Sequence, residues 1–163
     1  MIAEISLGLA GFAGVAVMLG RGPGLWSPAD ALRIRFLLAA AFSALFASLV
    51  ATGSDWAGAD RATSIRLGAG TLLVGQVYWG LVPARSLRLL EPAERALFDR
   101  RLAIVIRVAM YLSWAAQALA LSGFAGRAAS WLFLYGLLAS LSYAALGFVR
   151  LLFVRPSTST DAA

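Results

Sequence analysis

Five long apolar runs constrain the fold of this 163-residue chain more than any other feature. They cover about 2–20, 31–51, 64–83, 102–121 and 128–154. Each approaches the ~20 residues that a helix needs to cross ~30 Å of hydrocarbon. With 61% hydrophobic and 13% charged residues, the chain has too little polar surface for a water-soluble domain. We therefore predict an all-α fold: a polytopic transmembrane helical bundle of five spans, one domain over 1–155, followed by a disordered tail over 156–163.

The arginines are distributed unevenly among the connections between these runs. One side of the predicted bundle holds ten of them: Arg21, Arg33, Arg35, Arg85, Arg88, Arg95, Arg100, Arg101, Arg150 and Arg155. The other side holds three, Arg61, Arg66 and Arg127. Because arginine-rich loops stay in the cytoplasm, this distribution predicts an N-out, C-in orientation. The alanine-rich, lysine-free composition suggests a bacterial source, so we expect a multi-pass protein of the bacterial inner membrane.

The net charge of +6 has the same origin in topology and does not predict a nucleic-acid partner. Cysteine, histidine and lysine are absent from the sequence. Their absence excludes thiolate chemistry, a lysine Schiff base and the usual histidine ligands and bases. The sequence therefore predicts no enzyme, no catalytic residue, no metal and no cofactor. Its glycines in the third run precede no Gly-Lys-Ser/Thr and do not form a nucleotide loop.

Arg107 is the ionisable residue at greatest predicted membrane depth. Two interpretations stay open: its long side chain snorkels to the cytoplasmic headgroups, or it faces a water-filled cavity or an ion-pair partner. Arg107, Tyr111, Trp114 and Ala118 share one helical face, and Gln117 lies beside it. We expect this polar–aromatic stripe to point into a bundle or pore rather than to lipid.

Three further polar residues fall within the runs. Glu4 lies one turn inside the outer end of the first run, where pairing with an interfacial arginine is the favoured role and a path-lining role the alternative. Gln76 and Gln117 are neutral hydrogen-bonding residues that either join helices or line a path. We count all three, with Arg107, Tyr111 and Trp114, as pore or cavity candidates.

Small residues recur at four-residue spacing on four of the runs. Such spacing lets helix backbones approach closely, which stabilises packing in lipid. An alanine-rich chain also produces it by chance, and whether the packing lies within one chain or between chains stays open. The predicted packing residues include Ala10, Gly14, Ala44, Ser48, Gly75, Gly136, Ser140 and Ala144.

Prolines mark predicted helix boundaries. Ser27-Pro28-Ala29-Asp30 has the pattern of a helix start, with a capping residue and a proline in the first turn. Pro83 is expected to stop or kink the third span. Glu91-Pro92-Ala93-Glu94 predicts the start of a helix that continues from a cytoplasmic turn into the fourth span.

Three segments carry a resemblance to known proteins. They are Gly11-Phe12-Ala13-Gly14-Val15, the segment from Trp26 to Arg35, and Gly147-Phe148-Val149-Arg150-Leu151-Leu152-Phe153. Together they resemble small uncharacterised bacterial multispan inner-membrane proteins of the same layout. The resemblance covers both ends of the chain, leaves the middle unsupported and implies no activity.

The sequence favours an oligomeric membrane protein that forms or gates a pore for ions or small solutes. The alternative is a non-catalytic accessory or assembly subunit of a larger inner-membrane complex. An intramembrane enzyme or lipid-handling protein is the least favoured class because reactive side chains are missing. The expected partners are the lipid bilayer and either further copies of the chain or another membrane protein.

Overall fold

Four long helices make up almost all of the chain that the structure describes. The computed structural model describes residues 8, 11, 28–89 and 100–153, and the side chains within 31–81 and 104–149. The helices are α2 (Pro28–Trp56), α3 (Arg61–Leu89), α5 (Arg100–Ser122) and α6 (Ala129–Phe153), with a short 3-10 turn, η1 (Gly126–Ala128), before α6. These described residues contain no strand. The all-α prediction is therefore confirmed.

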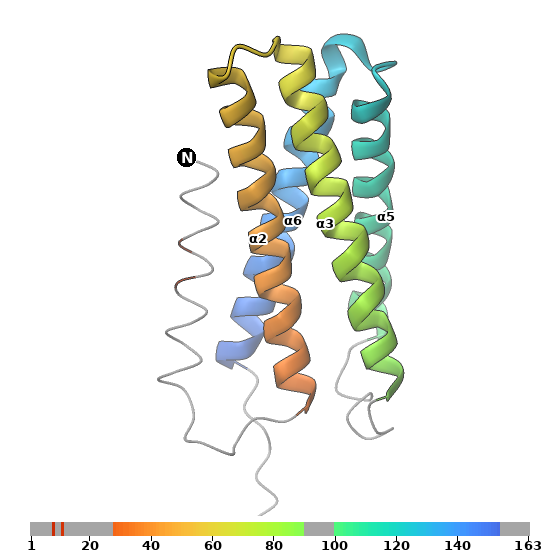
Figure 1. Cartoon of the computed structure of the whole chain (residues 1–163). Coiled ribbons are helices and arrows are strands. Elements are labelled where there is room, and N and C mark those ends of the chain that lie inside the picture. The colour runs from red at the N-terminus through yellow and green to blue at the C-terminus, as the bar shows by residue number, and fades with distance from the viewer. Residues whose placement is uncertain (1–7, 9–10, 12–27, 90–99, 154–163) are drawn as a thin grey trace, which may run out of the picture.

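The four helices form an up-and-down bundle (Figure 1). Helices α2 and α5 each pack beside α3 and α6, and α3 also meets α6 across the centre. The α2–α3 and α5–α6 connections lie at one end, which we call the loop end. The opposite end gathers the start of α2, the end of α3, the start of α5 and the end of α6. We call it the arginine end, because these helix ends contain Arg33, Arg35, Arg85, Arg88, Arg100, Arg101 and Arg150.

Three of the described helices are long and apolar enough to cross a membrane: Ala31–Trp56, Ile104–Ser122 and Gly126–Val149. Only 33%, 22% and 28% of their most apolar stretches, respectively, are buried inside the bundle, so most of their apolar side chains face outward. This fits an integral membrane protein. The predicted first span, 2–20, lies outside the described residues. The predicted third span, 64–83, lies within α3, which is as long as α2 but less apolar than the other three helices.

The structure confirms one proline prediction and corrects part of another. Helix α2 begins at Pro28, as the sequence predicts, because proline at the first helical position loses no intrahelical hydrogen bond. Helix α3 does not stop at Pro83 but continues to Leu89. The expectation of a stop is wrong: proline removes one hydrogen bond from a helix interior without ending the helix, and such prolines are tolerated in membrane helices. The predicted helix start at 91–94 lies outside the described residues.

The connection between α2 and α3 is a tight turn that Asp60 ends. Gly58 adopts a φ of 86°, in the left-handed region that favours glycine. Asp60 then caps α3, its carboxylate accepting hydrogen bonds from the amides of Ala62 and Thr63 at 2.9 and 3.0 Å. The Thr63 hydroxyl donates to the second carboxylate oxygen at 2.7 Å. These hydrogen bonds lower the pKa of Asp60, and the bond from the Thr63 hydroxyl has the largest effect.

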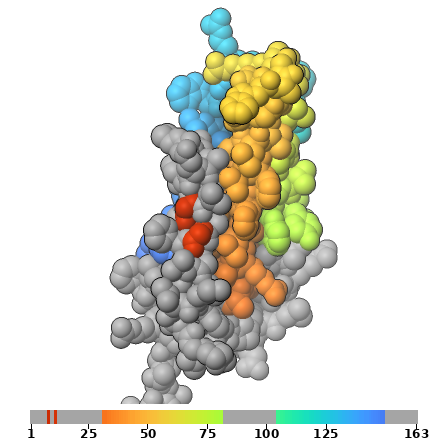
Figure 2. Space-filling model, turned by 60° about the vertical axis from the view of Figure 1, so that its left-hand side comes forward, coloured from red at the N-terminus to blue at the C-terminus, as the bar shows by residue number. Residues whose placement is uncertain are grey.

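Alanines and leucines build the core of the bundle. One buried cluster joins α2, α3 and α6 through Ala44, Ala47, Leu72, Leu137 and Leu141. A second cluster joins α2 and α6 through Leu37, Ala41 and Ala144. Large apolar side chains on the same helices point outward, among them Phe42, Phe46, Trp56 and Trp131. Figure 2 shows the outer side of α2 with α3 beside it. Buried alanines at the helix contacts, with bulky aromatic side chains on the outside, are typical of helices packed in lipid.

Candidate functional site

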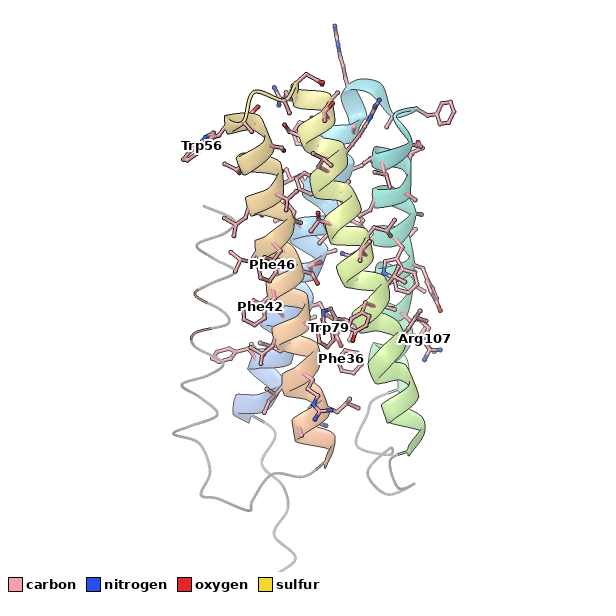
Figure 3. The ribbon with its side chains drawn as sticks, viewed as in Figure 1. Phe36, Phe42, Phe46, Trp56, Trp79 and Arg107 are labelled. Carbon is pink, nitrogen blue, oxygen red and sulfur yellow. The ribbon has the colours of Figure 1, made fainter. Side chains whose placement is uncertain are left out.

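The predicted site residues separate into two groups on either side of the bundle wall. Gln76 and Gln117 lie in the interior, whereas Arg107 and Tyr111 lie on the exposed side of α5. Figure 3 shows Arg107 extending away from the other helices. Within one chain the structure therefore does not bring the pore candidates together.

Gln76 of α3 is the centre of a polar cluster at the middle of the bundle. Its amide nitrogen donates to the Ser113 hydroxyl of α5 at 3.0 Å and to the Ser140 hydroxyl of α6 at 2.8 Å. The carbonyl oxygen of Gly136 lies 3.4 Å from the same nitrogen. Ser113 in turn donates to the Gln76 side-chain oxygen at 3.2 Å. One amide thus connects three helices by direct hydrogen bonds, and we call these four residues the polar core.

Gln117 lies one turn beyond Ser113 on α5 and is fully buried. Its amide nitrogen donates to the backbone carbonyl of Leu132 at 2.9 Å, which joins α5 to α6. Its side-chain oxygen is buried with no hydrogen-bond partner. Gly136 makes this close approach possible: a Cβ at that position would lie 2.7 Å from Gln117 Cδ and 3.1 Å from Leu72 Cδ2.

Outward-facing residues of α5 form the predicted polar–aromatic stripe. Arg107 and Tyr111 are exposed, and Ala118 is exposed as well. Trp114 is half-buried, and its ring packs edge-to-face on Tyr111 with centroids 5.4 Å apart. The expectation that this stripe points into the bundle is wrong within one chain. Both sides of a membrane helix are compatible with apolar and aromatic residues, so a shared face does not reveal its direction.

Trp114 fills the seam between α3 and α5 near the arginine end. A Cβ on Gly80 would lie 2.8 Å from its Cζ2 atom and 3.3 Å from the sulfur of Met110. The indole nitrogen is buried and has no hydrogen-bond partner. Trp114 therefore acts as a packing residue between these two helices.

Most of the predicted packing residues of α2, α3 and α6 lie at helix contacts. Ala44 and Ala144 are fully buried, and Ser140 is buried in the polar core. A Cβ on Gly75 would lie 2.5 Å from the hydroxyl oxygen of Ser43, so α2 and α3 approach closely there. Ser48 is half-buried and donates to the carbonyl of Ala44 at 2.8 Å. Glu4, Ala10 and Gly14 lie outside the described residues.

Sequence reasoning missed three residues that the bundle uses. Ser43 meets Gly75, Ser113 belongs to the polar core, and Gly68 packs on α2, where its Cβ would lie 2.9 Å from the Cβ of Ala51. A signal for Ser113 exists, because Ser113, Gln117 and the small residues Ala116 and Ala120 share one face of α5. That face is the buried one.

The chemistry available at these positions is limited. Among the described residues, no group of three or more acidic, histidine or cysteine side chains is placed to hold a metal ion. The polar core consists of neutral amide, hydroxyl and carbonyl groups, which hydrogen-bond but neither titrate near neutral pH nor act as activated nucleophiles. The hydrogen bonds of the polar core join α3, α5 and α6.

No protein-family model, curated protein or solved structure matches the chain. The resemblance to small bacterial inner-membrane proteins therefore stays a prediction.

Proposed function

We propose that the chain is a five-span protein of the bacterial inner membrane, oriented N-out and C-in. The three apolar helices support membrane insertion. Helix α3 has the same length as α2 and lies between α2 and α5, so it would cross the bilayer with them. The gathering of the arginine-rich helix ends at one end of the bundle supports the orientation.

Reporter fusions test this topology. A periplasm-dependent enzyme fused after Ala57, in the loop end, should be active, whereas the same enzyme fused after Arg155 should be inactive. The opposite pattern would overturn the orientation. Activity at both sites, or at neither, would overturn the number of spans, since three crossings by α3, α5 and α6 place the two positions on opposite sides of the membrane.

We further propose that the protein acts as a non-catalytic assembly subunit, through contacts of its lipid-facing surface with other membrane helices. The direct hydrogen bonding of Gln76 across the bundle carries this proposal. With contacts of 2.8 and 3.0 Å to Ser140 and Ser113, no water layer fits between α3, α5 and α6 at that level. A solute path through the single bundle is thereby disfavoured, and the exposed outer sides remain available for function.

Capture of the full-length protein from its native membrane in mild detergent tests the assembly role. We expect a second membrane protein in stoichiometric amount. Ala115 lies on the exposed side of α5 between Tyr111 and Ala118, so Ala115→Trp should weaken capture at least several-fold. Ser142 is similarly exposed on α6, and Ser142→Trp is the matched control. Recovery of the chain alone, as a monomer, would contradict the proposal.

A pore between copies of the chain is the second candidate. The outward position of Arg107 and Tyr111 favours it, because copies that pack around α5 would turn these side chains toward a shared axis. Rings of basic side chains select anions. Anion flux into liposomes by the pure protein, reduced by Arg107→Ala, would support the pore and overturn the assembly role.

A further inference from the structure

A shallow groove follows the seam between α3 and α5 in the half of the bundle near the loop end. It is distinct from the polar core and from the stripe on α5. Its lining comes from one side of α3 and from the last turn of α5: Thr63, Arg66, Leu67, Gly70, Thr71, Val74 and Leu121. The groove is open beside Gly70, which has no side chain. A Cβ on Gly70 would only touch Leu121, at 3.5 Å.

The same seam is closed nearer the arginine end. There Trp114 and Met110 of α5 reach across to Gly80 of α3. No residue of comparable size covers Gly70, so the seam between the two helices is filled over one half and hollow over the other.

The groove is polar at one end and apolar along the rest of its length. Arg66 is exposed and lies one turn from the start of α3. Farther along, Leu67 and Val74 are 48% and 70% exposed, so a ligand in the groove would bury apolar area on both. The Thr71 hydroxyl adds no free donor, because it donates to the carbonyl of Leu67 at 2.9 Å. A groove with a cationic end and an apolar remainder is complementary to an amphiphile that has an anionic head and an apolar chain.

The position of Arg66 depends on the turn that follows α5. Gly123 adopts a φ of 80°, and a Cβ there would overlap the Arg66 guanidinium, lying 3.0 Å from its Cζ atom. The missing side chain thus leaves space for the guanidinium against this turn. Arg66 makes no ion pair with a carboxylate of the described residues. Asp60 is near enough for electrostatic attraction, but its oxygens accept the hydrogen bonds of Ala62 and Thr63.

We propose that this groove binds one anionic phospholipid of the adjacent leaflet, with the phosphate on Arg66 and an acyl chain along Leu67, Gly70 and Val74. Charge complementarity selects the head, since an arginine near the surface attracts anionic lipid and its planar guanidinium suits phosphate. The apolar half selects a chain rather than a free ion. This inference rests on the proposed placement in the membrane but not on the assembly role.

Native mass spectrometry of the full chain, delipidated in mild detergent and titrated with phosphatidylglycerol or phosphatidylcholine of the same acyl chains, tests the site. We expect one phosphatidylglycerol to be retained in preference to phosphatidylcholine. Arg66→Gln should weaken phosphatidylglycerol binding about five-fold, from ~1 kcal/mol per arginine near a charged surface. Arg127→Gln is the matched control, because Arg127 is exposed at the same end but outside the groove. Gly70→Leu should fill the groove and reduce the retention of phosphatidylglycerol, while the helical content of the protein stays unchanged.

Four results would overturn the lipid site. They are equal retention of both lipids, an Arg127→Gln effect as large as that of Arg66→Gln, unchanged binding in Gly70→Leu, and displacement of the lipid by millimolar inorganic phosphate. Occupation by a second copy would appear as a disulfide-linked dimer of Thr71→Cys, a clean test because the chain has no cysteine. If the chain were soluble without detergent, the proposed membrane placement would be overturned. If the chain were captured without a partner, only the assembly role would be overturned.

Discussion

On helix α5, Ser113 and Gln117 face the bundle interior, whereas Arg107 and Tyr111 lie on its exposed side. The interior side is small, polar and joined to α3 and α6 by hydrogen bonds. The exposed side consists mostly of large apolar side chains such as Val105, Val108 and Leu112. Among the α5 residues whose side chains the structure describes, 104–122, the one charged residue is Arg107. Polarity in this helix therefore serves two purposes: neutral groups hold the helices together inside, and the charged group lies on the surface. Substitutions on the two sides should therefore differ in their effect on stability.

The largest effect is expected from Gly136→Ala. The added Cβ would lie 2.7 Å from Gln117 Cδ and would displace the amide that bonds Leu132. Overpacking combined with a lost buried hydrogen bond should lower the free energy of unfolding by about 3 kcal/mol. The matched control is Gly53→Ala, because Gly53 also lies within a helix but a Cβ there would have no atom within 4 Å. This substitution should be neutral or should stabilise the protein by about 0.5–1 kcal/mol. Reversible unfolding in detergent measures both, and equal effects would contradict the tight contact at Gly136.

Gln76→Leu should have the next largest effect. It removes the amide that bonds Ser113 and Ser140, while both hydroxyls remain able to bond carbonyls of their own helices. We expect a loss of about 1 kcal/mol, in the range of interhelical hydrogen bonds in membranes. Thr71→Val is the control, since its hydroxyl bonds only within α3. If Thr71→Val cost as much as Gln76→Leu in the same unfolding assay, the polar core would not join the helices.

A smaller, pH-dependent effect is expected at Asp60. Hydrogen bonds from Thr63 lower the pKa of its carboxyl in the folded state, so the stabilisation is complete above the unfolded-state pKa and is lost as the pH falls through the folded-state pKa. Asp60→Ala should lower the melting temperature by ~1–2 °C at pH 6, because the loss of a helix cap has a small cost at this exposed position. The difference between Asp60→Ala and the wild type should shrink on acidification to pH 3. Asp60→Asn keeps a capping group, and a melting temperature equal to that of Asp60→Ala at pH 6 would contradict the capping role.

Arg107→Gln should have the smallest effect on stability, within about 0.5 kcal/mol, because the residue is exposed and the structure gives it no packing role. Gln117→Leu on the interior side of the same helix is the comparison, and it should cost more because it removes the bond to Leu132. A larger loss for Arg107→Gln than for Gln117→Leu in the unfolding assay would reverse the assignment of the two sides.

The sequence predicts where the helices lie better than which way they face. The apolar runs at 31–51, 102–121 and 128–154 overlap α2, α5 and α6, because a span of the bilayer requires a long uninterrupted helix. Direction is harder to predict, since lipid accepts the same apolar side chains as a helix interface does. The sequence pattern therefore places Trp114 and Tyr111 inside, and it does not distinguish Ser113, a small residue between two larger ones. Gly75 and Gly136 indicate close contacts through their spacing, but their partners, Ser43 and Gln117, follow only from the packing of different helices.

Thiol labelling of Ser113→Cys in native membranes tests most directly the central claim that the bundle interior is closed and function lies on its outer surface. The chain has no cysteine of its own, and Ser113 is 1% exposed. A small, charged, membrane-impermeant thiol reagent should leave Ser113→Cys unmodified from either side of the membrane, while Ala57→Cys in the exposed loop end reacts readily. Modification of Ser113→Cys in the folded protein, from either side, would demonstrate a water-filled path through the polar core and contradict the account.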